Sequence, residues 1–234
     1  MINPGAALLL LLASAVLCGC ANDPGSSDDR FEQTNRSVFA FNQKVDHTIA
    51  RPVAEFYNYA VPRFARDGFH NVLTNLDSPV TLANDMFQAD VVRTSETAGR
   101  LAINSTLGLG GIVDLASRLG IPAHNADFGE TLGKYGIGDG PYLELPLLGP
   151  SNPRDFAGSI IDVFFDPLTY VGGPALEVGR EGGDVLDLRA ANIDTLDELQ
   201  QSSVDFYATV RSAYRQHRAF EISHGQNSSD LPNY

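Results

Sequence analysis

The chain has 234 residues, which is long enough for one sizeable domain with its own core. It carries 29 acidic and 16 basic residues, a formal net charge of −13. This acidity argues against nucleic acid as a partner, which needs basic surfaces. It also argues against electrostatic docking on anionic lipid headgroups, which needs clustered Lys and Arg. The five histidines show no ligand spacing, so neither a metal nor another cofactor is expected.

Residues 1–19 have the pattern of a lipoprotein signal peptide. The apolar run at 6–17 is shorter than the ~20 residues that span a bilayer, and it has the length of a secretory signal. It leads into Leu-x-Gly-Cys, which resembles a bacterial lipobox. We therefore expect cleavage before Cys20 and a lipid anchor on its thiol, followed by a tether over 20–30. An unlipidated secreted protein, or cleavage at Cys18, stays open, because no Lys or Arg precedes the run.

Helical periodicity dominates the first half of the chain. Apolar residues recur at helical spacing over about 28–50, 63–76, 94–103 and 112–119. Asp28-Asp29 offers an N-cap for the first of these helices, and Pro52 ends or restarts it. Ser78 followed by Pro79 has the pattern of a cap and a first helical residue, so it predicts that a separate helix opens there.

The second half adds two longer helices and one weak strand. Asp155 could cap a helix that is apolar over most of its circumference, which indicates either burial in the core or contact with lipid. A final helix over 195–221 has its acids early and its arginines late, as the helix macrodipole favours. Strand-like alternation is confined to 142–145. The pattern predicts an all-α single domain over 31–222, with a loose polar tail at 223–234.

Two glycine-rich stretches, 108–111 and 129–149, do not fit a regular helix. Glycine-rich loops can cradle phosphate, but neither stretch has the G-x-G-x-x-G or P-loop spacing. Tight turns with positive φ are therefore expected instead of nucleotide binding.

An enzyme is not expected. Ser159 lies outside any G-x-S-x-G elbow, which a lipase of the α/β-hydrolase type would need. Asp85 or Asp127 together with His124 makes no recognisable catalytic constellation.

The segment at 127–150, DFGETLGKYGIGDGPYLELPLLGP, resembles the signature of the MlaA (VacJ) lipoprotein family. Other family-like pieces occur in the family's order on both sides of this segment, over about 28–220. They include Phe31-Glu32, Asn35-Arg36, Phe39-x-Phe41-Asn42, Arg51-Pro52-Val53-Ala54, Asn104-Ser105-Thr106 and Asp166-Pro167.

This resemblance implies a ring of amphipathic helices that lies in one membrane leaflet around a polar channel. It implies a lipoprotein anchored at Cys20 on the periplasmic side of the outer membrane. Such a protein associates with a trimeric porin, removes mislocalised phospholipids from the outer leaflet and passes them to a soluble periplasmic carrier, which maintains lipid asymmetry. The alternative is an adaptor that docks the carrier on a porin without conducting lipid.

Three sets of residues are candidates for a lipid path. Desolvating one unpaired polar group costs ~2–7 kcal/mol, so a hydrated lumen would lower the barrier for a headgroup. A lip or hinge is expected at Gly133, Gly136, Gly138 and Gly140, unless these are rigid turns. Asn35, Arg36 and Asn42 either face the lumen or make structural hydrogen bonds. Tyr135 and Tyr142 either mark a headgroup boundary or pack in the core.

Overall fold

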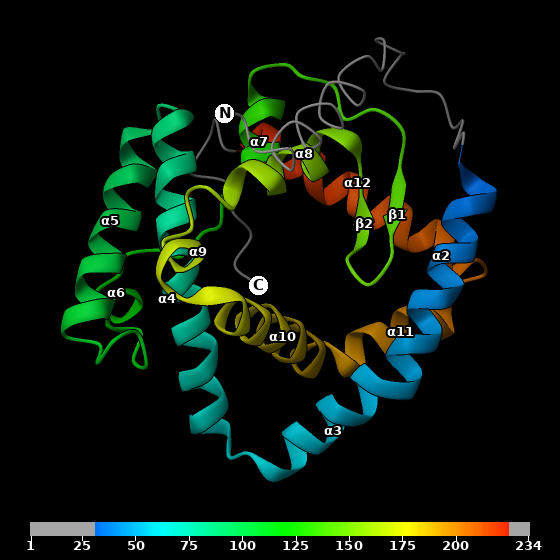
Figure 1. Cartoon of the computed structure of the whole chain (residues 1–234), viewed down its shortest axis with the longest axis horizontal. Coiled ribbons are helices and arrows are strands. Elements are labelled where there is room, and N and C mark those ends of the chain that lie inside the picture. The colour runs from blue at the N-terminus through cyan, green and yellow to red at the C-terminus, as the bar shows by residue number, and fades with distance from the viewer. Residues whose placement is uncertain (1–30, 225–234) are drawn as a thin grey trace.

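The computed structural model describes residues 31–224. The predicted signal peptide, Cys20, the tether, the Asp28-Asp29 cap and residues 225–234 of the tail lie outside the described residues. Within the described part, helices follow one another around a central opening, as Figure 1 shows.

The chain is helical apart from one hairpin. Its helices are α2 (Glu32–Val45), the π-helical turn η1 (Asp46–Ala50), α3 (Arg51–Ala60), α4 (Arg63–Phe87), α5 (Val91–Thr106), α6 (Leu115–Arg118), α7 (Phe128–Lys134), α8 (Pro153–Asp162), α9 (Leu168–Val171), α10 (Gly173–Ala191), α11 (Ile193–Ser202) and α12 (Phe206–His224). Strands β1 (Leu143–Leu145) and β2 (Gly149–Ser151) pair antiparallel. The all-α prediction is confirmed, and the weak strand signal at 142–145 corresponds to β1.

Two arcs of the chain run beside each other in the ring (Figure 1). The N-terminal arc consists of α2, η1, α3 and α4, and the C-terminal arc consists of α10, α11 and the start of α12. Helix α10 packs against α3 and α4, and α11 packs against α3. On the remaining side, α7, α8 and α12 pack together, and the hairpin contacts both α2 and α12. Parts of the sequence that are far apart therefore border the same opening.

The sequence predicted that Pro52 either ends the first helix or restarts it, and the structure shows a restart. Helix α3 begins at Arg51, and Pro52 occupies its first turn, where a missing N–H is tolerated. The π-helical turn η1 comes directly before it, and the Arg51 N–H bonds to the carbonyl of Asp46, five residues back. This widened turn carries the chain into the proline without breaking the helical path.

Pro79 does not open a new helix, so that prediction was wrong. Helix α4 runs through it, and the Ser78 hydroxyl donates back to the Thr74 carbonyl at 3.0 Å instead of capping a helix. Residues on both sides of Pro79 are buried, including Leu73 and Asn84. Packing against α5 and α10 thus holds the helix together across a local breaker.

Two further helix boundaries differ from the predictions. Asn152, not Asp155, caps α8, because its side chain accepts the Asp155 backbone N–H at 2.9 Å. The predicted helix over 195–221 is two helices, separated at Ser203, whose backbone is extended. Asp205 lies in the gap and accepts the Ala208 N–H at 3.1 Å, which gives α12 its own start.

The ring buries polar groups and exposes large apolar ones. The largest fully buried side chains are those of Tyr142, Glu130, Asn84, Thr131 and Asp85. By contrast, Phe56, Tyr59 and Phe64 are 68%, 89% and 79% exposed, and Phe164, just after α8, is exposed as well. Contiguous apolar surface of this kind marks contact with a membrane or a protein. Within residues 31–224, no helix combines the length and the apolar character needed to cross a bilayer.

Candidate functional site

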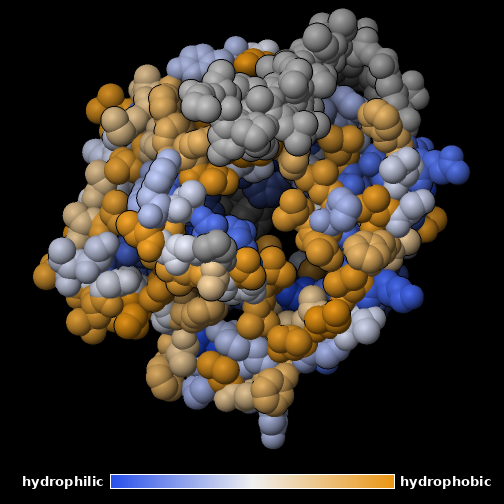
Figure 2. Space-filling model, in the orientation of Figure 1, coloured by the Kyte–Doolittle hydropathy of each residue, from blue (hydrophilic) through white to orange (hydrophobic). Residues whose placement is uncertain are grey.

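The molecule is hollowed at the centre of the ring (Figure 2). Hydrophobic residues gather over much of the visible face, and hydrophilic residues lie among them near the margin of the hollow. The signature segment at 127–150 supplies α7 and nearly all of the hairpin, and α8 follows it directly; all three lie along this opening.

Helices α7 and α8 cross with their backbones in contact. A Cβ atom on Gly158 would lie 2.3 Å from the backbone nitrogen of Gly129, closer than real Cβ contacts allow. Only glycine permits this approach. The crossing brings the first turns of α7 and α8 together, and both turns carry acidic side chains.

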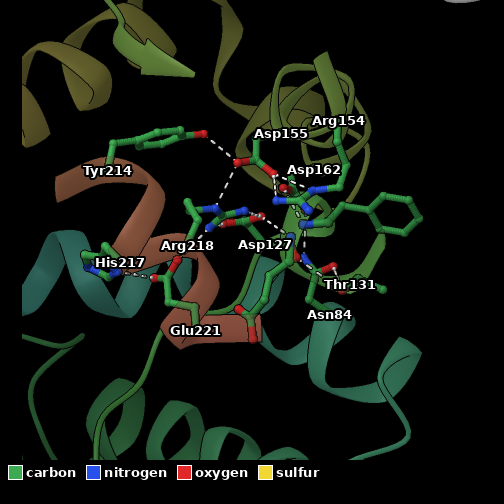
Figure 3. Close-up of polar contacts among 12 residues, drawn as sticks. Asn84, Asp127, Thr131, Arg154, Asp155, Asp162, Tyr214, His217, Arg218 and Glu221 are labelled. Atoms are coloured by element: carbon green, nitrogen blue, oxygen red, sulfur yellow. Dashed lines mark hydrogen bonds and ion pairs between the residues drawn. The ribbon is translucent and has the colours of Figure 1, made fainter. Parts of the chain in front are cut away.

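Arg218 of α12 joins these two helices (Figure 3). Its guanidinium donates to both carboxylate oxygens of Asp127 at 2.7 and 2.9 Å, and to Asp155 at 2.9 Å. Tyr214 also donates to Asp155, at 2.5 Å. Burial acts to raise the pKa of Asp155, but the hydrogen bonds from Arg218 and Tyr214 outweigh it and lower that pKa. The aspartate is therefore ionised, and α12 is held against the start of both helices.

A second polar group ties α4 to the same crossing. Asn84 donates to Asp162 at 2.7 Å and accepts the Thr131 hydroxyl at 2.9 Å (Figure 3). Asp162 also accepts the Phe128 backbone N–H at 2.9 Å. Burial raises the pKa of Asp162, opposed by these hydrogen bonds. The signature segment is thus anchored to α4, α8 and α12 by buried and partly buried hydrogen bonds.

Asn35 and Asn42 hold the hairpin against α2. Asn35 donates to the Tyr142 carbonyl at 2.9 Å and accepts the Glu144 N–H at 3.0 Å. Asn42 donates to the Glu144 carboxylate at 2.9 Å and accepts the Leu147 N–H at 2.8 Å. These contacts agree with the structural alternative for both residues, and a role in the lumen stays a prediction.

Arg36 links α2 to the start of α12. It donates to both oxygens of Asp205, at 3.2 and 2.6 Å, and to Glu32 at 2.8 Å. Its guanidinium also lies 4.5 Å from the ring centre of Tyr207. The hydrogen bond from Arg36 lowers the pKa of Asp205 to about 2. The Arg36 guanidinium, a candidate for the lumen, is thus hydrogen-bonded to other side chains of the protein.

The two candidate tyrosines lie in different surroundings. Tyr142 is 1% exposed, packs edge-on against Tyr207 and Tyr214, and donates to Glu144 at 2.5 Å. Its burial agrees with the core-packing alternative, and a headgroup-boundary role for Tyr142 stays a prediction. Tyr135 is exposed, with its hydroxyl donating to a backbone carbonyl of α4 at 2.6 Å, and its boundary role stays a prediction.

The four candidate glycines differ in what constrains them. Gly136 and Gly140 have φ of +83° and +76°, so they form the expected tight turns. Gly133 lies in α7, where a Cβ would meet Ile222 of α12 at 2.6 Å. Gly138 has neither constraint, because among the described residues no atom lies within 4 Å of a Cβ built there. A lip or hinge at these residues stays a prediction.

Sequence reasoning missed the residues that close this part of the ring. The sequence pattern explains Arg218 only through the helix macrodipole, and Tyr214 carries no signal in the sequence. Their partners lie 63 and 59 residues away along the chain, at Asp155. No local spacing encodes such a contact. Within the described part of the chain, His, Cys, Asp and Glu do not group in threes as a metal site would need.

Comparison with known proteins shows which family this chain belongs to. The family model described as MlaA lipoprotein matches residues 27–221, most of the chain. The chain belongs to this family.

Named relatives and a solved structure agree with that membership. The chain is 34% identical to "Intermembrane phospholipid transport system lipoprotein MlaA" of Haemophilus influenzae, over 94% of this chain and 91% of the relative. It is 35% identical to the protein of the same name from Escherichia coli K12, over 93% and 88%. A solved chain described under "Structural basis for maintenance of bacterial outer membrane lipid asymmetry" matches with a TM-score of 0.77 and 34% identity, over 84% of this chain and all of that chain.

Proposed function

We propose that this MlaA-family chain moves mislocalised phospholipids out of the outer leaflet of the outer membrane, through the opening of its ring, and thereby maintains lipid asymmetry. The hollow at the centre of the ring is the observation that carries the proposal (Figure 2). The names of the relatives, which specify intermembrane phospholipid transport, support it.

The exposed apolar side chains support a position within one leaflet. Burying apolar surface in hydrocarbon contributes roughly 25 cal/mol per Å², so residues such as Phe56, Tyr59 and Phe64 favour immersion. Helices that lie along a leaflet need no bilayer-spanning length. A lipid on Cys20 would add a second attachment, as stable anchoring requires.

The path itself needs no covalent chemistry. A headgroup inside the ring would keep water or polar contacts while its acyl chains stay in lipid, which avoids the cost of desolvation. The loop after α7, which includes Gly138, would form the lip of the opening. A trimeric porin would hold the ring at the outer leaflet, and a soluble periplasmic carrier would receive the lipid.

The alternative is an adaptor that brings the carrier to a porin without conducting lipid. One observation favours it: Asn35, Arg36 and Asn42 all bond to other parts of the protein. The two functions differ in whether a bulky group at the lip stops lipid removal.

The test expresses the full chain in Escherichia coli cells that lack their own MlaA, and measures phospholipid on the cell surface. Gly138→Trp adds bulk where the backbone has room and φ is not positive. Ser95→Trp is the matched control, at an exposed position of α5, a helix that lies apart from the opening in Figure 1. We expect the wild-type chain and the control to clear surface phospholipid, and Gly138→Trp to fail while still co-purifying with a porin.

Other outcomes contradict parts of the proposal. If the wild-type chain leaves surface phospholipid unchanged, phospholipid removal is wrong. If Gly138→Trp clears lipid as well as the control does, the lip assignment fails and the adaptor is favoured. Cys20→Ser tests the anchor, and full activity of that variant would contradict the need for a lipid at this residue.

A further inference from the structure

We propose that the cavity between the α4–α5 turn and the end of α7 binds the headgroup of a zwitterionic phospholipid, with Lys134 facing its phosphate and Asp90 its ammonium. The cavity has a volume of about 510 Å³ and is lined by Gln88, Ala89, Asp90, Val91, Val92, Lys134 and Tyr135. The inference rests on the proposed function and specifies the lipid class.

The turn that forms one wall is fixed by backbone hydrogen bonds. The Ala89 N–H bonds to the Met86 carbonyl at 3.0 Å, and the Asp90 N–H bonds to the Asp85 carbonyl at 3.1 Å. This pair of bonds is a Schellman motif, whose left-handed residue is usually glycine. Here it is Ala89, with φ of +55°, so an alanine methyl is placed in the wall at some cost in strain.

The end of α7 contributes a lining cation, Lys134, which has an N–H donor left for a ligand. The Lys134 ammonium is 2.7 Å from the Glu130 carboxylate and also donates to Gln88. An ammonium has three N–H donors, so these two contacts leave one for a ligand. Glu130 is 2% exposed and does not line the cavity, so it lies behind Lys134 and holds the cation in place.

The charged groups at the cavity form two ion pairs, so their charges sum to zero. On the α5 side, Asp90 caps the helix by accepting the Arg93 N–H at 3.0 Å, and the Arg93 guanidinium lies 3.9 Å from its other oxygen. On the α7 side, Lys134 is paired with Glu130. A neutral site that offers one lining cation, Lys134, and one lining carboxylate, Asp90, suits a zwitterion better than an anion.

Apolar groups at the mouth favour a lipid over a free phosphate. Val91 and Tyr135 line the cavity and are exposed, and Met86 and Phe87, immediately before the turn, are exposed as well. A glycerol backbone and the first part of its acyl chains could cover this surface. Free phosphate would leave it in contact with water.

The experiment uses the absence of tryptophan from the sequence. Val92→Trp introduces a single indole at the cavity of the full chain in detergent micelles, and its fluorescence reports binding. The probes are glycerophosphoethanolamine, glycerophosphoglycerol and inorganic phosphate, which are water-soluble and do not partition into the micelles. We expect glycerophosphoethanolamine to change the emission at lower concentration than the other two.

Charge variants in the Val92→Trp background test which residue contacts the ammonium and which contacts the phosphate. Asp90→Asn keeps the N-cap, since Asn caps as well as Asp, but removes the charge. It should raise the Kd for glycerophosphoethanolamine about tenfold, the usual effect of losing a charge-assisted hydrogen bond, and leave that for glycerophosphoglycerol unchanged. The double change Glu130→Gln with Lys134→Gln should weaken both probes. Asp194→Asn, an exposed acid in the first turn of α11, is the matched control.

Three results would overturn the inference. They are no response to any probe, an equal response to inorganic phosphate and glycerophosphoethanolamine, and an Asp90→Asn variant that binds like the control. If the chain clears surface phospholipid in cells and one of these results is found, only the headgroup site is wrong. If the chain clears no lipid but the indole responds as expected, the site stands and the proposed transport is wrong.

Discussion

Individual charged residues in this protein are buried beside opposite charges, and their surroundings set their protonation. Arg218 lies between Asp127 and Asp155, and hydrogen bonds from Arg218 and Tyr214 outweigh the burial of Asp155. Asp184 on α10 differs, because acids surround it. Burial, followed by the nearby Asp77 carboxylate, raises the pKa of Asp184 to about 6.

We expect Asp184 to make the protein less stable as the pH rises through about 6. Its pKa in the folded protein is above the ordinary value of 3.8, so between those values the folded state binds more protons than the unfolded state. Its stabilising contribution is therefore complete at low pH and lost towards neutrality. The charged groups around it are Asp77, Glu181, Asp187 and Arg180.

Thermal melts of Asp184→Asn at pH 5 and pH 7.5 check this. The variant should melt higher than wild type at pH 7.5 and show a smaller difference between the two pH values. Asp194→Asn, in the exposed first turn of α11, should keep the wild-type difference. An Asp184→Asn profile parallel to that of wild type would contradict the assignment.

At the scale of elements, close backbone approach sets one helix crossing in the ring. Glycine–glycine contact sets the crossing of α7 and α8, and the buried hydrogen bonds of Asn84 and Arg218 then fix it from outside. Gly179 on α10 has a different setting. At Gly179, a built Cβ meets no atom of the described residues within 4 Å.

We expect Gly158→Ala to destabilise the protein by about 3 kcal/mol or more, since its methyl would overlap the backbone of α7, which cannot move aside cheaply. The matched substitution Gly179→Ala should instead stabilise by up to about 1 kcal/mol, because alanine favours an open helical position. Urea unfolding of both variants measures the difference. Equal midpoints would show that the crossing tolerates a wider spacing.

At the scale of the whole molecule, four arginine–aspartate ion pairs bridge the two arcs within the described residues, in addition to the contact of His70 with Asp187. The four pairs are Arg36–Asp205, Asp46–Arg189, Arg51–Asp197 and Asp77–Arg180. The paired residues of the N-terminal arc alternate in charge along the chain: arginine, aspartate, arginine, aspartate. If the arcs were aligned differently, residues of like charge would come together. The pairs thus specify how the arcs align as well as holding them together.

Charge reversal at the Asp46–Arg189 pair tests this alignment. The two side chains are mostly buried, with contacts of 2.6 and 2.9 Å. Asp46→Arg alone should lower the free energy of unfolding by about 2 kcal/mol or more, because it places two cations together. Adding Arg189→Asp should restore most of the loss, as a denaturant-based double-mutant cycle would show. A double variant no more stable than the single one would mean that this pair does not align the arcs.

Local patterns in the sequence determined the helical class, the restart at Pro52, the tight turns at Gly136 and Gly140, and the family. Each of these depends on neighbours within a few residues, through helical spacing, proline geometry or a contiguous motif. The lipid anchor predicted at Cys20 has the same local basis and awaits its test.

The tertiary structure decided what happens where distant segments meet. It carried α4 through Pro79, separated α11 from α12, and buried Tyr142 among Tyr207 and Tyr214. It also brought Arg218 to acids that come 63 and 91 residues earlier. These outcomes depend on packing and on paired burial of charge between remote residues, which no local spacing encodes.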